Sequence, residues 1–190
     1  MADPNEIQDH DIYIGVDRGA LILSDLGIKM HSAVGDFDSI HDADLEKIRA
    51  FSKTMVQLEV IKNESDLEVA LIMYHNLASS IVVYGGLGGR QDHQYVNFKL
   101  MLKYPHVELV DAHNRCIILT QPQQIKKAHY RYFSIFALEP SRVSIENAKY
   151  ELDDVLLTPA DLYTLSNEFV NAEVRISVKG RVLVILSVDA

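Results

Sequence analysis

Ala33-Val34-Gly35-Asp36-Phe37-Asp38-Ser39-Ile40 places two carboxylates two residues apart, directly after a glycine and a short apolar approach. In an extended backbone, such residues point to the same side. Neighbouring carboxylates repel unless a proton or a cation neutralises them, and divalent metals prefer oxygen ligands. The strip therefore predicts a divalent-metal site at the end of a strand, although Asp-x-Asp in a loop is most often a solvated turn.

Around this strip, short apolar runs typical of strands alternate with segments whose apolar residues have helical spacing. Strands are expected at 11–17, 33–35, 56–61, 80–84 and 107–110, and helices at 20–27, 41–51, 65–74 and 93–103. Ser65, followed three residues later by Glu68, has the form of a capping box and predicts the start of one helix. Strands that alternate with helices favour right-handed crossovers. We therefore expect an α/β N-terminal domain with a mostly parallel sheet over residues 1–112.

After about Ala112 the helical spacing becomes scarce and strand patterns take over. Strands are expected at 115–120, 130–138 and 142–145, and the runs 174–178 and 181–185 flank Lys179-Gly180 like the arms of a hairpin. These features predict an antiparallel β-sandwich C-terminal domain over residues 113–190.

Composition excludes several classes of protein. The 190 residues are 48% hydrophobic, which is enough for a sizeable core, and the net charge of −9 argues against nucleic acid as a partner. No run approaches the roughly 18 to 20 apolar residues of a membrane span. Cys116 is the single cysteine and lies in an apolar run, so a disulfide framework and a cysteine zinc site are excluded. The polar start of the chain is unlike a signal sequence, and we expect a cytoplasmic protein.

A glycine-rich loop follows the strand expected at 80–84. Gly85-Gly86-Leu87-Gly88-Gly89 allows backbone amides to approach a phosphate closely. The generic phosphate motifs fail, because Arg90-Gln91 stands where a P-loop needs Lys and then Ser or Thr. In an α/β sheet, ligands bind at the carboxyl ends of the strands, where the acidic strip, Asp66 and this loop are all expected. Their convergence indicates a phosphate and metal centre.

Four segments, in this order and approximate spacing, resemble the thiamine pyrophosphokinase family. They are Val16-Asp17-Arg18-Gly19-Ala20, Gly35-Asp36-Phe37-Asp38-Ser39-Ile40, Lys62-Asn63-Glu64-Ser65-Asp66-Leu67-Glu68, and Gly89-Arg90-Gln91-Asp92-His93 with Asn97. Lys149-Tyr150-Glu151-Leu152 and Ser166-Asn167-Glu168 are similar to later motifs of the family. The resemblance spans most of the chain.

The resemblance implies an enzyme that transfers pyrophosphate from Mg-ATP to the hydroxyethyl group of thiamine, giving thiamine diphosphate and AMP. It also implies a homodimer in which thiamine binds between the α/β domain of one subunit and the β domain of its partner. Asp36, Asp38, Asp66 and Asp92 would form the catalytic centre that holds Mg²⁺. The substrate-binding residues would be Asp17, Lys62, Ser65, Arg90, His93, Asn97, Ser166 and Asn167. Of these, Lys62 and Arg90 would contact phosphate oxygens, and Ser166 and Asn167 the thiamine ring. An aspartate of the centre or His93 is the candidate base.

The chain departs from the family pattern in three places. Arg18 stands where a second glycine is usual, and Ser65 replaces a threonine. Residues 1–11 lack the apolar strand and glycine-rich turn with which the family opens, so a shortened chain or another segment in that position is expected. Two alternatives stay open: a metal-dependent nucleotide or diphosphate phosphohydrolase, which would use water as nucleophile, and a non-catalytic ligand-binding relative without the first strand.

Overall fold

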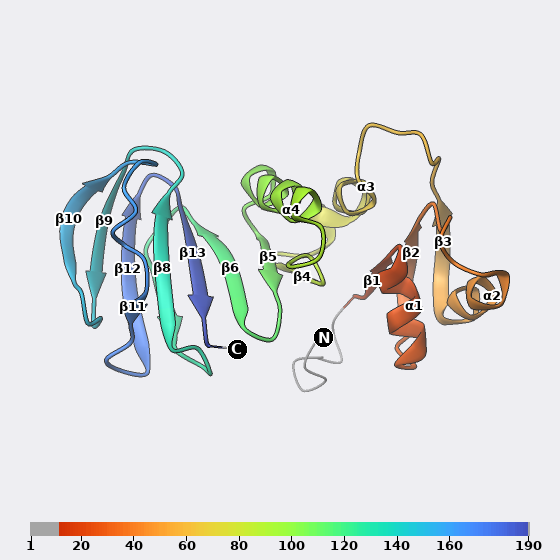
Figure 1. Ribbon diagram of the computed structural model, residues 1–190, viewed down its shortest axis with the longest axis horizontal. Coiled ribbons are helices and arrows are strands. Elements are labelled where there is room, and N and C mark those ends of the chain that lie inside the picture. The colour runs from red at the N-terminus through yellow and green to blue at the C-terminus, as the bar shows by residue number, and fades with distance from the viewer. Residues whose placement is uncertain (1–11, 190) are drawn as a thin grey trace. The chain divides into compact units, whose positions relative to one another are not determined.

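The computed structural model describes residues 12–189, which form two compact units, residues 12–79 and 80–189 (Figure 1). The expectation about the opening strand falls on residues 1–11 and lies outside the described residues. No helix within 12–189 is long and apolar enough to cross a membrane.

Residues 12–79 form a three-stranded parallel sheet with helices between its strands, in the order β1-β2-β3. The strands are β1 (Ile14–Val16), β2 (Met30–Gly35) and β3 (Ser52–Gln57). The helices are α1 (Arg18–Asp25), α2 (Asp42–Phe51) and α3 (Asp66–Tyr74), and the 3₁₀ turn η2 (His75–Leu77) follows. The strand expected at 56–61 is observed earlier, because β3 begins directly where α2 ends.

A small apolar core fixes the helices on this sheet. Ala20, Met30, Ala33, Phe37 and Ile48 are buried together. Helix α1 lies so close to β1 that a Cβ on Gly15 would lie 2.6 Å from the Cα of Ala20. Only glycine fits at that contact, so the sequence Ile-Gly-Val sets the distance between the first strand and the first helix.

Residues 80–189 hold two further sheets and one long helix, α4 (Gln91–Lys103). The six-stranded sheet has the order β11-β8-β13-β6-β5-β4, and the four-stranded antiparallel sheet has the order β10-β9-β12-β7. The first sheet contains β4 (Ile81–Tyr84), β5 (Val107–Val110), β6 (Asn114–Leu119), β8 (Tyr132–Ala137), β11 (Asn167–Glu168) and β13 (Val182–Ser187). The second contains β7 (Gln123–Lys126), β9 (Ser141–Glu146), β10 (Leu152–Leu157) and β12 (Glu173–Lys179).

The two sheets of residues 80–189 share one apolar core. It includes Phe133 and Val184 from the six-stranded sheet and Val143, Val174 and Ile176 from the four-stranded sheet. Alternate residues of β9, β12 and β13 are buried, as expected for strands with one face on a core. This part of the chain is therefore an antiparallel sandwich, and β4 extends its larger sheet by a parallel pairing with β5.

The hairpin predicted around Lys179-Gly180 is wrong. Strand β12 pairs with β7 and β9, whereas β13 pairs with β6 and β8, so the turn carries the chain from one sheet to the other. Gly180 has a φ of 126°, and a Cβ there would lie 2.3 Å from Ser141 Oγ. The Lys-Gly turn signal was correct, but the sequence does not say with which strands its two arms pair.

The parallel sheet of residues 12–79 and the antiparallel sheets that follow fit the predicted combination of an α/β part and a β part. The compact units divide between Ser79 and Ser80, because β5 hydrogen-bonds to β6 in the larger sheet of the sandwich. A functional boundary near residue 112 stays a prediction.

Candidate metal and phosphate site

Asp17 lies directly after β1, in a backbone conformation that few residues adopt. Its φ is 47°, which is uncommon outside glycine but tolerated best by Asp and Asn. Its amide donates to the Val34 carbonyl of β2 at 2.8 Å. Gly35 allows this contact, because a Cβ there would lie 3.1 Å from the Cα of Asp17. The glycine before the acidic strip therefore makes room for the backbone of Asp17.

Asp36 lies directly after β2, next to the end of β1. The strip is not extended here, because Phe37 has a φ of 54° and buries its ring in the core. Asp38 is consequently exposed, and its amide approaches Asp36 Oδ1 at 3.4 Å. The side chain of Gln57 donates to the Asp36 carbonyl at 2.6 Å, which ties the strip to β3.

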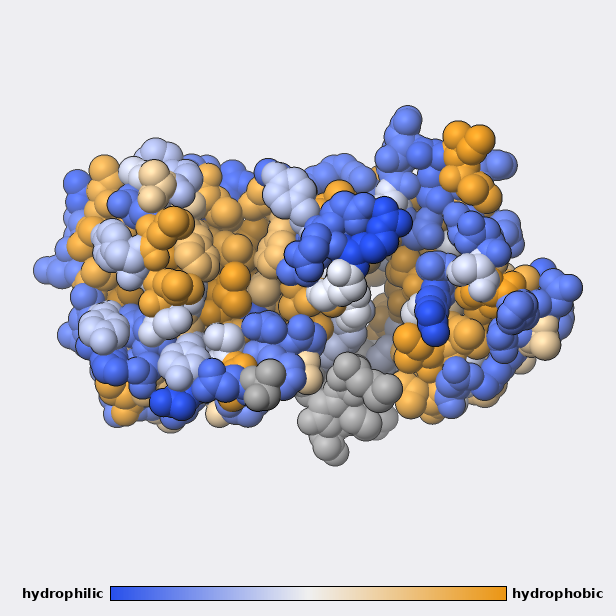
Figure 2. Space-filling model, viewed as in Figure 1, coloured by the Kyte–Doolittle hydropathy of each residue, from blue (hydrophilic) through white to orange (hydrophobic). Residues whose placement is uncertain are grey.

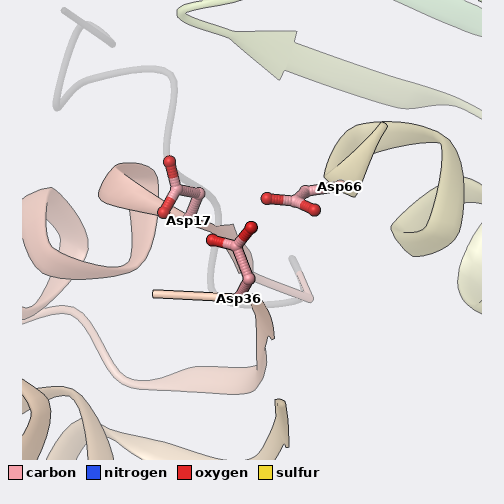
Figure 3. Close-up of side chains that lie close together, drawn as sticks. All are labelled: Asp17, Asp36 and Asp66. Carbon is pink, nitrogen blue, oxygen red and sulfur yellow. The ribbon is translucent and has the colours of Figure 1, made fainter. Parts of the chain in front are cut away.

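Asp66 is the first residue of α3, and the capping box predicted its place correctly. The hydroxyl of Ser65 accepts from the Glu68 amide at 3.2 Å. Helix α3 packs against β1 and β2, which brings its first turn to the carboxyl ends of these strands. Figure 3 shows the side chains of Asp17, Asp36 and Asp66 lying close together.

The three carboxylates lie close enough to share one cation. Each offers an oxygen, and these oxygens all lie within 4.8 Å of one another. Asp17 Oδ1 is buried and has no hydrogen-bond partner among the described residues. Burial raises the pKa of Asp17, and repulsion from Asp66, Asp36 and Asp38 raises it further. Convergent carboxylate oxygens, one of them buried without a partner, are a donor set that fits Mg²⁺.

Lys62 neutralises part of this charge. Its ammonium lies 2.8 Å from Asp66 Oδ1 and 3.8 Å from Asp36 Oδ2, and it also donates to the Glu59 carbonyl at 3.1 Å. The hydrogen bond to Asp66 is the main reason why the pKa of Lys62 is raised. The three side chains are 16% to 19% exposed, so the ion pairs are only partly screened by water.

The glycine loop 85–89 is held from α4. Asn97 donates to the Gly86 carbonyl at 2.8 Å, and the Gly88 amide donates to Gln94 at 3.1 Å. Asn97, predicted to bind substrate, thus shapes the loop in this structure.

The first turn of α4 carries the remaining residues of that motif. Arg90 and Asp92 form a bidentate pair at 3.1 and 2.5 Å, and both side chains are exposed. The hydrogen bond from Arg90 lowers the pKa of Asp92 to about 2. Asp92 Oδ1 also accepts from the amide of His93, whose ring is exposed.

Ser166 and Asn167 lie at the start of β11. Ser166 is exposed and has a φ of 57°, and its amide donates to Ser134 Oγ at 3.0 Å. Asn167 is buried, and its amide group bonds to the backbone of Tyr150. The two neighbours therefore have opposite exposure.

The structure thus brings Asp17, Asp36, Lys62, Ser65 and Asp66 together within residues 12–79. Arg90, Asp92, His93 and Asn97 lie at the start of α4, and Ser166 and Asn167 lie in the sandwich. The sequence did not predict Asp17 as a metal ligand, although it follows β1 as Asp36 follows β2. The carboxyl ends of adjacent parallel strands share one edge, and that signal was present in the sequence.

Two protein-family models match the chain. The first, described as "Thiamin pyrophosphokinase, catalytic domain", matches residues 4–110, which is more than half of the chain. The second, described as "Thiamin pyrophosphokinase, vitamin B1 binding domain", matches residues 122–183. The acidic cluster lies within the first match, and Ser166 and Asn167 lie within the second.

Individual proteins that are similar to this chain agree with these matches. The thiamine pyrophosphokinase of Bacillus subtilis (strain 168) is 29% identical over 192 residues, covering 95% of this chain and 89% of that relative. The crystal structure of the Bacillus subtilis thiamine pyrophosphokinase superposes with a TM-score of 0.88, covering 98% of this chain and 92% of that one. A family protein from Enterococcus faecalis, 25% identical, gives a TM-score of 0.87, with 100% and 93% covered. This chain belongs to the thiamin pyrophosphokinase family.

Proposed function

We propose that this chain transfers the pyrophosphoryl group of ATP to the hydroxyethyl oxygen of thiamine. The oxygen attacks the β-phosphorus, the bond between that phosphorus and the α,β-bridging oxygen breaks, and AMP leaves. The observation that carries the proposal is the convergence of Asp17, Asp36 and Asp66 within the segment that matches the catalytic domain of the family.

The metal site of the proposed enzyme lies at the carboxyl ends of β1 and β2. Asp17, Asp36 and Asp66 would hold Mg²⁺, and Asp38 and Asp92 stay candidates for the same centre. When bound, Mg²⁺ neutralises charge on phosphate oxygens. The buried oxygen of Asp17, which has no partner among the described residues, supports this assignment.

Cationic side chains would contact phosphate oxygens of ATP. Lys62 lies beside Asp36 and Asp66, and its ammonium would contact a phosphate oxygen there. Arg90 is exposed and is oriented by Asp92. Transfer of a phosphoryl-type group depends mainly on positioning and on neutralising charge, which these groups supply. The proton of the thiamine hydroxyl would pass to an aspartate of the centre, with His93 as the second candidate.

Thiamine would bind through the part of the chain that matches the vitamin B1 binding domain. Ser166 is exposed at the start of β11, and apolar side chains reach the surface over the sandwich strands, on the left of Figure 2. We assign residues 1–112 to the catalytic domain and 113–190 to thiamine binding and dimerisation, as the ends of the two family matches suggest. The homodimer and the cytoplasmic location belong to this proposal as well.

The test is to incubate the protein with thiamine and Mg-ATP and to separate the products. Equal amounts of AMP and thiamine diphosphate are expected. ADP with thiamine monophosphate would mean transfer of a single phosphoryl group. Inorganic phosphate or pyrophosphate formed equally well without thiamine would identify a hydrolase and overturn the proposal.

A binding measurement covers the case in which no product forms. Calorimetry with thiamine and with a non-hydrolysable ATP analogue reports each site separately. Binding of both ligands without release of AMP at long times would favour the non-catalytic relative.

A further inference from the structure

Arg18 is a cationic residue directly beside the acidic cluster. It is the first residue of α1 and follows Asp17, whose carboxylate belongs to the cluster. Arg18 is exposed, and its guanidinium forms no ion pair and donates no hydrogen bond to any group within residues 12–189. Its five donors are therefore free to bind a ligand.

The position of Arg18 is unfavourable for a cation on local grounds. The first turn of a helix carries a partial positive charge, so acidic residues are favoured there and basic residues are not. The first turn of α1 contains no acidic residue that would offset Arg18. Asp17 is the N-cap residue, but its side chain makes no capping hydrogen bond to α1. Residues that break a local rule without local compensation are expected at functional sites.

Arg18 and Lys62 adjoin different members of the cluster. The Lys62 ammonium lies 2.8 Å from Asp66 Oδ1 and 3.8 Å from Asp36 Oδ2, and it forms no ion pair with Asp17 in the described part of the chain. Arg18 is the neighbour of Asp17. One divalent cation would balance the charge that Lys62 leaves on the three carboxylates. The negative charge of a bound polyphosphate then needs a further cation, and Arg18 is placed to supply it.

We infer that Arg18 binds a phosphate group of the nucleotide beside the metal site. The inference rests on the proposed function and deepens it, because it names a residue for the donor substrate. A guanidinium presents its donors in a planar fork that matches two oxygens of one phosphate. Thiamine does not fit this position, since its thiazolium is cationic and the guanidinium would repel it.

Calorimetry with Mg²⁺ and a non-hydrolysable ATP analogue tests this role. Arg18→Gln removes the charge, and the Kd for the analogue should rise about tenfold, as the loss of one charge-assisted contact predicts. Arg18→Lys keeps the charge without the planar fork, so a rise of about threefold is expected. Lys29→Gln is the matched control, because Lys29 is also exposed but directly precedes β2, at the opposite end of that strand from Asp36. Its Kd should stay within about twofold of the parent value.

The salt dependence of the same Kd reports the charge itself. Salt screens a contact between charged groups that are exposed to water. The Kd of the parent protein should therefore rise more steeply with NaCl concentration than that of Arg18→Gln, and Lys29→Gln should keep the parent slope. A loss of affinity in Arg18→Gln with an unchanged slope would mean that the substitution acts through the packing of α1, and it would overturn the phosphate contact.

AMP and inorganic pyrophosphate are probes for the two parts of the nucleotide. AMP carries the α-phosphate, and pyrophosphate represents the transferred group. Weaker binding of AMP by Arg18→Gln would assign Arg18 to the α-phosphate, and weaker binding of pyrophosphate would assign it to the transferred group. Unchanged binding of both probes and of the ATP analogue would overturn the inference.

Steady-state kinetics separate the donor from the acceptor. Arg18→Gln should raise KM for Mg-ATP about tenfold and leave KM for thiamine within about twofold of the parent value. A rise in KM for thiamine alone would show that Arg18 serves the acceptor and would contradict the inference.

The outcomes distinguish this inference from the proposed function. A parent protein that neither binds the ATP analogue nor forms AMP overturns the proposed function, and the role of Arg18 with it. A parent protein that forms AMP and thiamine diphosphate, while Arg18→Gln matches Lys29→Gln in every measurement, overturns the role of Arg18 alone. Circular dichroism and Tm should stay at the parent values in Arg18→Gln, because the side chain is exposed. If that variant fails to fold, Arg18→Lys decides the point.

Discussion

Asp17, in residues 12–79, and Asn167, in residues 80–189, differ in the hydrogen bonding of their side chains. Asp17 keeps a buried oxygen without a partner among the described residues, and burial raises its pKa. Asn167 makes three hydrogen bonds and is 6% exposed. An unsatisfied buried group costs free energy that a ligand can recover, whereas a satisfied one stabilises what lies around it. Asp17 therefore keeps bonding capacity for a ligand, whereas the side chain of Asn167 is bonded within the protein.

The two units also hold these residues by different means. In residues 12–79, strained backbone at Asp17 and Phe37 directs the carboxylates to one edge of a small sheet. In residues 80–189, a sandwich with a large apolar core supports a network of bonds around a surface tyrosine. Charged groups held close together, like these carboxylates, are typical of functional sites. The acidic cluster is therefore expected to be the more sensitive site for activity, and the sandwich for stability.

Asp66→Asn gives the largest expected effect. It removes one charge from the cluster with little change in volume, and kcat should fall by about 100-fold or more because several kcal/mol of charge stabilisation depend on the site. The measurement is the initial rate of AMP formation at saturating thiamine and Mg-ATP. Asp42→Asn is the matched control, since Asp42 is also the first residue of a helix but is exposed on α2. An equal loss of kcat in both variants would contradict the assignment of Asp66 to the metal site.

Gly180→Ala tests the dependence of the sandwich on its turn between sheets. The new Cβ would lie 2.3 Å from Ser141 Oγ in a backbone with φ of 126°, so the free energy of unfolding should fall by about 2 to 4 kcal/mol. Urea denaturation measures the change. Gly27→Ala is the comparison in the other unit, with a φ of 72° but open space around it, and a loss of about 1 kcal/mol is expected there.

Asp17→Asn should stabilise the metal-free protein. The raised pKa means that folding disfavours the ionised carboxylate, so the destabilisation is present when Asp17 is ionised and disappears as the pH falls and it protonates. In EDTA at pH 7, the variant should have a higher free energy of unfolding than the parent, because desolvation and repulsion are relieved. Thermal scans with and without MgCl₂ measure this, and the gain should shrink toward pH 4. A variant that Mg²⁺ stabilises as much as it does the parent would remove Asp17 from the metal site.

Arg90→Gln gives the smallest expected effect on stability. Loss of the Arg90 hydrogen bond should raise the pKa of Asp92 from about 2 toward its ordinary value of 3.8, as followed by carboxyl NMR titration. A carboxylate whose pKa is lowered by folding stabilises the protein at pH values above its pKa in the unfolded state. This stabilisation is lost as the pH falls through its pKa in the folded state. Both side chains are exposed, so no measurable change in unfolding is expected. Lys149→Gln should leave the Asp92 pKa unchanged.

The sequence predicted the start of α3 well, for a local reason. Ser65 caps α3 through a bond three residues away, which needs no tertiary contact. The expectation that Asp36 and Asp38 share a side failed, because burial of Phe37 turns the backbone out of an extended conformation. The predicted hairpin at Gly180 failed for a related reason, since turn residues do not record the strands with which the flanking strands pair.

The sequence by itself determined the residue types of the site and their order, because capping, turns and strand periodicity are encoded within a few neighbouring residues. Its motifs also indicated the family to which the chain belongs. Tertiary structure decided that oxygens of Asp17, Asp36 and Asp66 come within 4.8 Å of one another, because the parallel pairing of β1 with β2 and the packing of α3 bring these distant carboxylates together. It alone decided that Asn167 is buried beneath an exposed Tyr150, since hydrogen bonds between residues 17 positions apart leave no local trace in the sequence.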